Sequence, residues 1–136
     1  MLLFNPSLGQ ITDRLHILSL KIDAFRRAER NASALVNERN RCYDRIGDIT
    51  AKLVSYEYWE YHRLSSELFK QNLCQWDAED ELRKLLPTLD DVPSYGVLLL
   101  IAELAKKTHH GNENRNRLVA EIDDLVGEVP ERKIYS

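Results

Sequence analysis

The sequence predicts an all-α protein, an antiparallel bundle of four to five helices in a single domain that spans residues 1–136. Apolar side chains recur at alternating three- and four-residue spacings, which is the period of an amphipathic helix. Only five Gly and four Pro occur, too few for a turn-rich all-β protein. A chain of 136 residues has room for one hydrophobic core.

The first predicted helix begins at a capping box, in which Ser7 is followed three residues later by Gln10. Its apolar residues recur at spacings 3-4-3-4-3: Leu8, Ile11, Leu15, Leu18, Ile22 and Phe25. A second apolar face on the same helix predicts that it lies at the centre of the bundle: Ile17, Leu20 and Ala24.

The second predicted helix runs from Leu35 to Leu53, with Gly47 as a weak point. Residues 55–58 leave two alternatives open, a turn or a helix continuous with the next one. The third helix follows, reaches about Leu86 and stops before Pro87.

The segment from Pro87 to Pro93 is the clear loop of the chain, and Ser94 is a candidate N-cap for the last helix. The stripe of this helix keeps its phase through its middle: Val97, Ile101, Leu104, Thr108, Gly111, Arg115, Leu118, Ile122 and Leu125. We therefore expect one helix of about thirty residues, roughly 45 Å long. Gly127 and Pro130 end it, and a short extended tail follows.

Composition and simple motifs exclude several classes of function. Nineteen basic and 22 acidic residues leave a net charge of -3, so nothing favours nucleic acid as a partner. The longest apolar run, Val97–Ala102, is six residues, and no membrane span is expected. Cys42 and Cys74 are too isolated for a zinc site or a disulfide framework. Without a secretory signal at its start, the chain is predicted to be cytoplasmic.

Polar residues interrupt the apolar pattern near the middle of the two longest predicted helices. One column of the third helix reads Leu64, Leu68, Asn72, Trp76, Glu79, Arg83 and Leu86. In the last helix the break falls at Thr108, Gly111 and Arg115, with Asn112 beside it.

Antiparallel packing would bring these two midpoints together. We expect Glu79 or Asp80 opposite Arg115, because a buried carboxylate is costly unless it is paired. Such a polar centre is either a binding site or a network that only fixes the helix register. A competing phase of the third helix would turn the same groups outward: Leu64, Leu68, Gln71, Gln75, Ala78 and Leu82.

Three other patterns are weaker. Glu57-x-x-Glu60 and Glu121-x-x-Asp124 resemble the acidic pairs with which all-helical nucleotide pyrophosphohydrolases hold magnesium, although surface charge is the simpler interpretation. His109 and His110 precede Glu113 at helical spacing, but exposed histidines are the better interpretation, and no metal ligand is assigned. The aromatic cluster of Tyr56, Tyr58, Trp59 and Tyr61 is attributed to the core and its edge.

Four blocks of the chain resemble a family of small all-helical bacterial proteins of unknown function. The first block, S-[IL]-G-x-[LI]-x-D-[KR]-[LI]-x-I-L-x-[IL]-K, matches residues 7–21. The second, N-x-x-x-W-x-x-E-D-x-[IL]-R, matches residues 72–83, and the third, N-[DE]-x-R-x-x-L-x-x-x-I-[ND], matches residues 112–123. The terminal E-x-K-x-Y matches residues 131–135. The family tends to have Lys in place of Val119, an aromatic residue in place of His109 and Leu in place of Gln75.

The resemblance implies a cytoplasmic protein, sometimes encoded near glycosyltransferases of surface-polysaccharide synthesis, and it implies no particular reaction. Its blocks hold polar and aromatic residues that a packing scaffold does not require. The candidate ligand-binding residues are Asp13, Lys21, Asn72, Trp76, Glu79, Asp80, Arg83, Asn112, Arg115, Lys133 and Tyr135.

Three functions compete at this point, and no catalytic residue or cofactor is assigned. The leading hypothesis is a binding or accessory protein whose polar centre holds a partner protein or a small polar ligand. The alternative is a small magnesium-dependent hydrolase or transferase acting on a nucleotide or nucleotide-sugar. In that alternative Asp13, Glu79 and Asp80 serve as metal ligands or general base, while Lys21 and Arg115 clamp phosphate. A third hypothesis is a purely structural bundle that forms a homodimer.

Overall fold

The computed structural model describes residues 6–88 and 94–127, and all of its regular structure in these ranges is helical. The helices are α1 (Leu8–Arg27), α2 (Ser33–Thr50), α3 (Ser55–Leu85) and α4 (Tyr95–Leu125), with a 3₁₀ turn at Leu86–Thr88. They pack as an antiparallel bundle, so the prediction of an all-α bundle with four helices is confirmed.

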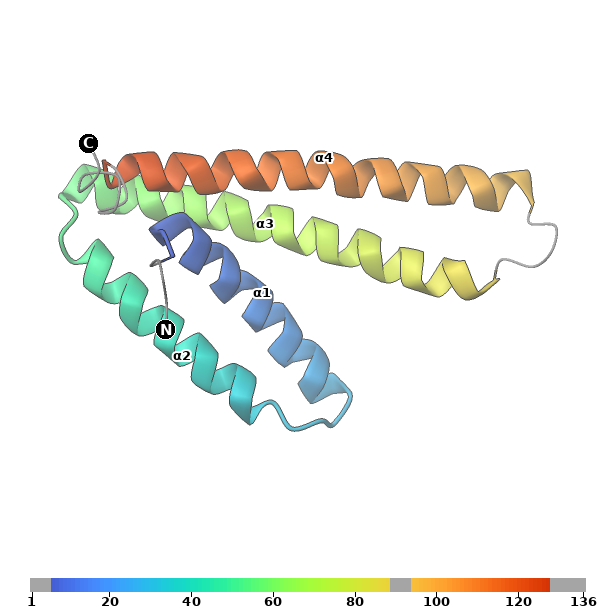
Figure 1. The fold of residues 1–136 in the computed structure, drawn as a ribbon, viewed down its shortest axis with the longest axis horizontal. Coiled ribbons are helices and arrows are strands. Elements are labelled where there is room, and N and C mark those ends of the chain that lie inside the picture. The colour runs from blue at the N-terminus through green and yellow to red at the C-terminus, as the bar shows by residue number, and fades with distance from the viewer. Residues whose placement is uncertain (1–5, 89–93, 128–136) are drawn as a thin grey trace.

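Two antiparallel pairs make up the bundle (Figure 1). The long helices α3 and α4 lie side by side along their length, and α1 pairs with α2. Helix α1 also packs against α3 and α4 at one end and then diverges from them, so the far end of α3 and α4 projects alone. We call this projection, residues 76–88 and 94–107, the arm, and the rest of the described chain the body.

The hydrophobic core lies in the body, where α1, α3 and α4 meet and α2 closes the outer side. Its buried members are Leu8, Ile11, Ile46, Tyr61, Leu64, Leu68, Leu118 and Ile122. Leu18, Leu68 and Ile122 are 0% exposed. The apolar stripe predicted for α1 therefore faces the core and α2, as its period indicated.

Local sequence determines three of the helix ends. The capping box of α1 is present, with the Ser7 amide donating to Oε1 of Gln10 and the Gln10 amide donating to Oγ of Ser7. Ser94 caps α4 by accepting a hydrogen bond from the Val97 amide. Gly127 follows α4 with φ of 87°, a left-handed conformation that favours glycine at the end of a helix.

The uncertain stretch, residues 55–58, is the first turn of α3, because the break between helices falls earlier, at residues 51–54. Helix α4 continues through Gly111 as one helix of 31 residues, as predicted. Pro87 lies in the 3₁₀ turn, whereas residues 89–93 of the predicted loop and the predicted tail fall outside the described residues. In the part of the chain that is described, no helix has the length and apolar character needed to cross a membrane.

Candidate functional site

Helix α3 turns a different side toward α4 from the one expected. The competing phase gives the contact with α4: Leu64, Leu68, Gln75 and Ala78 are buried along it. It does not turn every polar group outward, because Asn72 is 1% exposed. The two phases were difficult to separate because α3 has two covered sides in the body, one against α4 and one against α1. The column that contains Asn72, Trp76, Glu79 and Arg83 belongs to the α1 side.

The expected pairing of Glu79 or Asp80 with Arg115 is accordingly wrong. Glu79 is exposed, and Asp80 pairs within α3 with Lys84 at 3.1 Å and Arg83 at 3.9 Å. The partner of Arg115 comes from α1, with Nε of Arg115 donating to Oδ1 of Asp13 at 2.7 Å and Nη2 donating to Oδ2. A pair separated by 102 residues leaves no local signal in the sequence.

Asp13 joins α1, α3 and α4 at one point. Nδ2 of Asn72 donates to Oδ1 of Asp13 at 2.9 Å, so one carboxylate receives hydrogen bonds from both α3 and α4. The side chains of Asp13 and Arg115 are 15% and 31% exposed. The hydrogen bonds to Asp13 raise the pKa of Arg115 against the effect of burial, and the charges of Asp13 and Glu79 add to the rise. The guanidinium therefore stays charged beside its carboxylate.

Amide groups continue this polar junction along α3. Nε2 of Gln75 donates to Oδ1 of Asn112 at 2.6 Å and to the carbonyl of Thr108 at 3.4 Å. A Cβ on Gly111 would lie 2.7 Å from Cγ of Gln75, which explains a residue without a side chain there. Within the described residues, the buried carbonyl oxygens Oδ1 of Asn72 and Oε1 of Gln75 have no hydrogen-bond partner. Both can accept a further donor.

Beyond this junction the α1 side of α4 is uncovered. Residues seven apart share one side of a helix, so Leu98, Ala105, Asn112 and Val119 form a line. At Val119, α1 lies so close that a Cβ on Gly9 would approach the Val119 carbonyl oxygen to 2.4 Å. At the other end of the line, Leu98 is 47% exposed and Ala105 is exposed as well.

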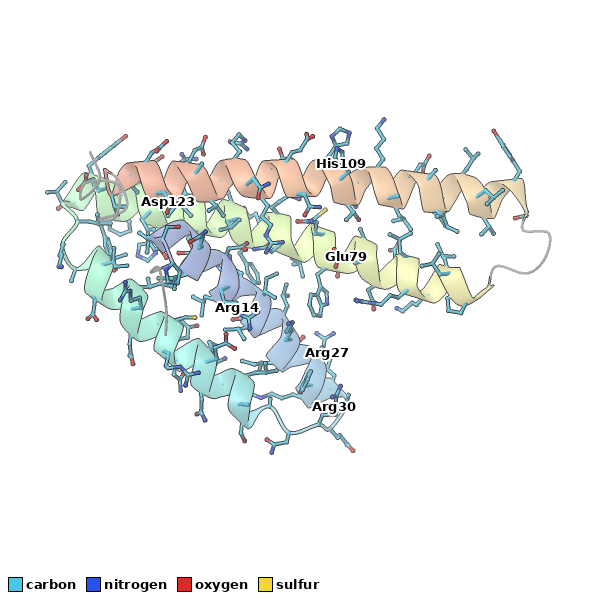
Figure 2. All side chains as sticks on the ribbon, viewed as in Figure 1. Arg14, Arg27, Arg30, Glu79, His109 and Asp123 are labelled. Carbon is cyan, nitrogen blue, oxygen red and sulfur yellow. The ribbon has the colours of Figure 1, made fainter. Side chains whose placement is uncertain are left out.

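Helix α3 likewise passes from coverage by α1 to exposure. The line Phe69, Trp76 and Arg83 begins under α1, where the rings of Phe69 and His16 meet edge to face at 5.3 Å. It ends at Arg83, which is exposed. Figure 2 shows why: Asp123 lies beside the start of α1, whereas Arg27 lies at its far end, clear of α4. We call the uncovered surface the open face. It begins at Trp76, which is half-buried, and continues over five exposed residues: Glu79, Arg83, Leu86, Leu98 and Ala105.

The structure thus divides the candidate residues into groups. Asp13 is bonded to both Asn72 and Arg115, whereas Asn112 is bonded to Gln75. The open face contains Trp76, Glu79 and Arg83. Lys21 lies about two turns along α1 from Asp13. Asp80 points away from the junction to Lys84, and Lys133 and Tyr135 fall outside the described residues.

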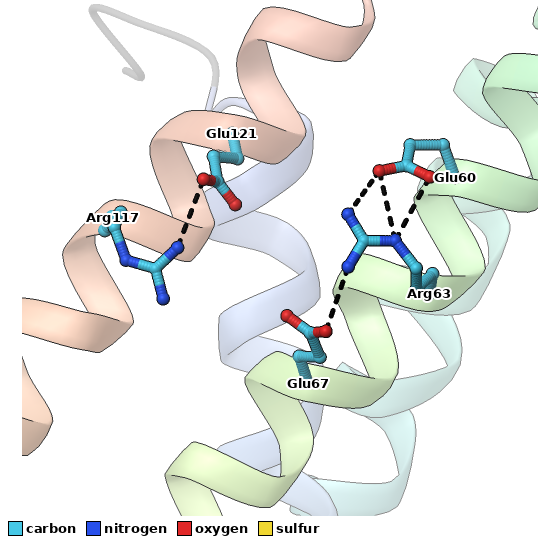
Figure 3. Close-up of polar contacts among 5 residues, drawn as sticks. All are labelled: Glu60, Arg63, Glu67, Arg117 and Glu121. Carbon is cyan, nitrogen blue, oxygen red and sulfur yellow. Dashed lines mark hydrogen bonds and ion pairs between the residues drawn. The ribbon is translucent and has the colours of Figure 1, made fainter.

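Glu60 of the first acidic pair lies near both acids of the second pair at the opposite end of α3 and α4, which spacing alone did not indicate. There an open cleft of about 380 Å³ is lined by Tyr56, Glu60, Arg63, Leu64, Glu121, Asp124 and Leu125. Figure 3 shows Arg63 between Glu60 and Glu67, and Arg117 bonded to Glu121 at 3.1 Å. The hydrogen bond from Arg63 lowers the pKa of Glu60.

No metal-binding group is assembled by these acids or elsewhere in residues 6–88 and 94–127, where no three His, Cys, Asp or Glu side chains converge suitably. Glu57 instead accepts a hydrogen bond from the Val54 amide at the start of α3. The acids named for magnesium do not converge either, because Asp13 is bound by Arg115 and Asp80 by Lys84.

The remaining candidates separate into exposed and buried groups. His109 is 73% exposed and pairs with Glu113 at 3.3 Å, pointing away from α3 (Figure 2). Of the aromatic cluster, Tyr61 is buried and its hydroxyl is 2.7 Å from Oγ1 of Thr12, whereas Tyr56 and Trp59 are 74% and 71% exposed.

Sequence reasoning missed His16, which is 7% exposed between α1 and α3. Its Nε2 lies 3.3 Å from Oγ of Ser65. Burial lowers its pKa from 6.5 to about 4, against the opposing effect of the Asp13 charge. His16 is polar and lies off the apolar stripe, so no periodic signal indicated its burial.

Comparison with protein-family models, with curated proteins and with solved structures finds no match to this chain.

Proposed function

We propose that this chain is a binding or accessory protein that takes the helices of a partner protein on the open face of its arm. The observation that carries the proposal is the end of α1 coverage. The same side of α3 and α4 is packed against α1 at Phe69 and Val119 and is bare at Arg83 and Leu98.

Two helices alone cannot bury the apolar surface that the arm carries. A helix pair covers one side of each member, so further apolar sides need another layer. Leu86 and Leu98 are 51% and 47% exposed, although Leu side chains of a folded domain are commonly buried. Exposed apolar patches bordered by polar residues mark interaction surfaces.

The chemistry of the open face suits a helical partner better than a small ligand. It is long and open, whereas small molecules bind in concave pockets that enclose most of their surface. An amphipathic helix places its apolar stripe along such a surface. Trp76 and Arg83 are of the residue types that dominate binding energy at interfaces.

The proposal is tested with a matched pair of variants in one turn of α4. Leu98 and Leu99 are 47% and 45% exposed, but neighbouring residues lie about 100° apart around a helix, so only Leu98 is on the open face. We expect Leu98→Glu to abolish binding of the partner and Leu99→Glu to retain it. Affinity capture with mass spectrometry, followed by titration of the identified partner, measures both.

Equal partner binding by the two variants, or no partner that distinguishes them, would contradict the proposal. Circular dichroism establishes that each variant is helical before the comparison is made. The cytoplasmic location and the association with surface-polysaccharide synthesis stay predictions of the sequence, and a glycosyltransferase captured through Leu98 would support the latter.

A further inference from the structure

We infer that the partner of the open face is a second copy of this chain, with the two arms packed antiparallel, α3 on α3 and α4 on α4, about a two-fold axis. The inference rests on the proposed function, because it names the occupant of the same surface. Four helices would then be layered where the isolated arm has two.

The open face is self-complementary along α3. Its residues Trp76, Glu79, Arg83 and Leu86 are spaced 3-4-3 and lie symmetrically about position 81. In an antiparallel pair centred there, Trp76 packs on Leu86 of the second copy and Glu79 faces Arg83 of the second copy. Two-fold symmetry repeats each contact, as it does in any interface that uses the same patch on both subunits.

The register between α3 and α4 places a small residue at the same axis. Gly111 lies against Gln75. Because the helices are antiparallel, the six positions from 75 to 81 on α3 correspond to the six from 111 back to 105 on α4. Ala105 therefore faces Ala105 of the second copy, where its small side chain allows the α4 helices to approach closely.

The charges that face each other are available for pairing. Glu79 has no ion pair in the described part of the chain, and Arg83 reaches Asp80 only at 3.9 Å with its side chain 62% exposed. A parallel two-fold arrangement would instead place α3 on α4, whose open-face residues Leu98 and Ala105 carry no charge to pair with Glu79 or Arg83. The charge pattern thus selects the antiparallel arrangement.

The size of the arm limits the affinity. The overlap from 76 to 86 is about 16 Å long and two helices wide, which puts the interface near the roughly 1,000 Å² minimum for specific association. We expect a dimer that dissociates in the micromolar range.

Charge exchange at the Glu79 and Arg83 pair tests the inference. Glu79→Arg and Arg83→Glu each place like charges opposite each other in a homodimer, so each is expected to weaken dimerisation at least about tenfold. An equimolar mixture of the two variants, and the double variant Glu79→Arg/Arg83→Glu, place opposite charges together again and should restore the dimer. Sedimentation velocity from about 1 to 200 µM covers the expected range.

The matched control is Glu81→Arg, which has the same change of charge two residues away but lies about 200° round the helix, on the opposite side of α3. The dissociation constant of the Glu81→Arg dimer should stay within about twofold of the wild-type value. Circular dichroism of every variant excludes loss of helix as the cause of dissociation.

A wild-type chain that stays monomeric at about 200 µM overturns the inference. If wild type is monomeric but Leu98→Glu prevents capture of a different protein, the proposed function stands without the homodimer. If Leu98→Glu prevents no capture, the proposed function and the homodimer are both wrong. A wild-type dimer that neither single variant weakens, or a mixture that does not recover, also overturns the inference.

Discussion

In the body α3 and α4 have α1 against a second side, whereas in the arm, among the residues that the structure describes, these two helices pack only against each other. Leu68 and Ile122 of the body are 0% exposed, but Leu86 and Leu98 of the arm are 51% and 47% exposed. The comparison shows that one pair of continuous helices presents the same side as core in one half and as surface in the other. The point where α1 stops covering α3 and α4 separates the buried half of this side from the exposed half.

The hydrogen bonds of α1 to α3 and α4 explain where that coverage ends. They come from Gly9, Thr12, Asp13 and His16, all in the first half of α1. The Gly9 amide donates to Oδ1 of Asp123 at 2.8 Å, which anchors the start of the helix. The second half of α1 then follows α2 away from the arm (Figure 1).

The largest expected difference between body and arm comes from one substitution made in each. Leu68→Ala should lower the free energy of unfolding by about 3 to 5 kcal/mol, because it leaves a cavity in a core with no room to relax. Leu98→Ala should cost less than about 1 kcal/mol, since the side chain is half exposed. Urea denaturation followed by circular dichroism measures both. Similar losses at the two positions would mean that the arm is as well packed as the body.

The next largest effect is a dependence of stability on pH, and it arises in the body alone. Because burial lowers the pKa of His16 to about 4, the folded body keeps this ring neutral while the unfolded chain binds a proton below pH 6.5. Stability should therefore be lost as the pH falls from 6.5 to about 4, by up to roughly 3 kcal/mol.

The control for this prediction is His16→Gln, which removes the titrating ring and retains every carboxylate. As the pH falls through that window, wild type should lose more unfolding free energy than His16→Gln does. A difference that is constant with pH would show that His16 titrates alike in the folded and unfolded chain.

Glycine replacements should have opposite signs in the two regions. A Cβ on Gly9 would lie 2.4 Å from the Val119 carbonyl oxygen, and backbone must shift, so Gly9→Ala should destabilise by about 2 kcal/mol. A Cβ on Gly96 meets nothing within 4 Å, so Gly96→Ala should stabilise by about 0.5 kcal/mol through helix propensity. Thermal unfolding separates the two, and destabilisation by Gly96→Ala would reveal a contact in the arm that the fold does not show.

The smallest expected effects distinguish the two halves of α1. Asp13→Asn removes a carboxylate bonded to Arg115 and Asn72 and should cost about 1 to 2 kcal/mol. Asp23→Asn removes an exposed pair with Arg27 and should cost less than about 0.5 kcal/mol. If chemical denaturation gave equal losses, the Asp13 junction would not be what holds α1 to the longer helices.

Much of the fold was accessible from the sequence because helices are determined by near neighbours. The capping serines Ser7 and Ser94 and the unbroken stripe of α4 are local features, and each was correctly predicted. The column containing Asn72, Trp76, Glu79 and Arg83 was also recognised as one unit. What it faces was assigned wrongly, because periodicity reports which residues share a side and not which helix covers it.

The candidate site was predictable only in part, for the same reason. Asn72 and Arg115 were named as polar members of a centre, but their link through Asp13 joins residues 102 positions apart. His16 and Gln75 are buried polar groups whose partners lie on other helices. Such contacts depend on how helices pack, which no local spacing encodes.

The sequence by itself determined the four helices apart from the break between α2 and α3, the caps at Ser7 and Ser94, and which residues share one side of a helix, since these depend on backbone geometry over a few residues. Only the tertiary structure decided that Arg115 pairs with Asp13 and that the side bearing Trp76 and Leu98 is left open. The physical reason is that burial is a property of the assembled helices: α1 departs after His16, and the side it leaves is surface whatever its residues are.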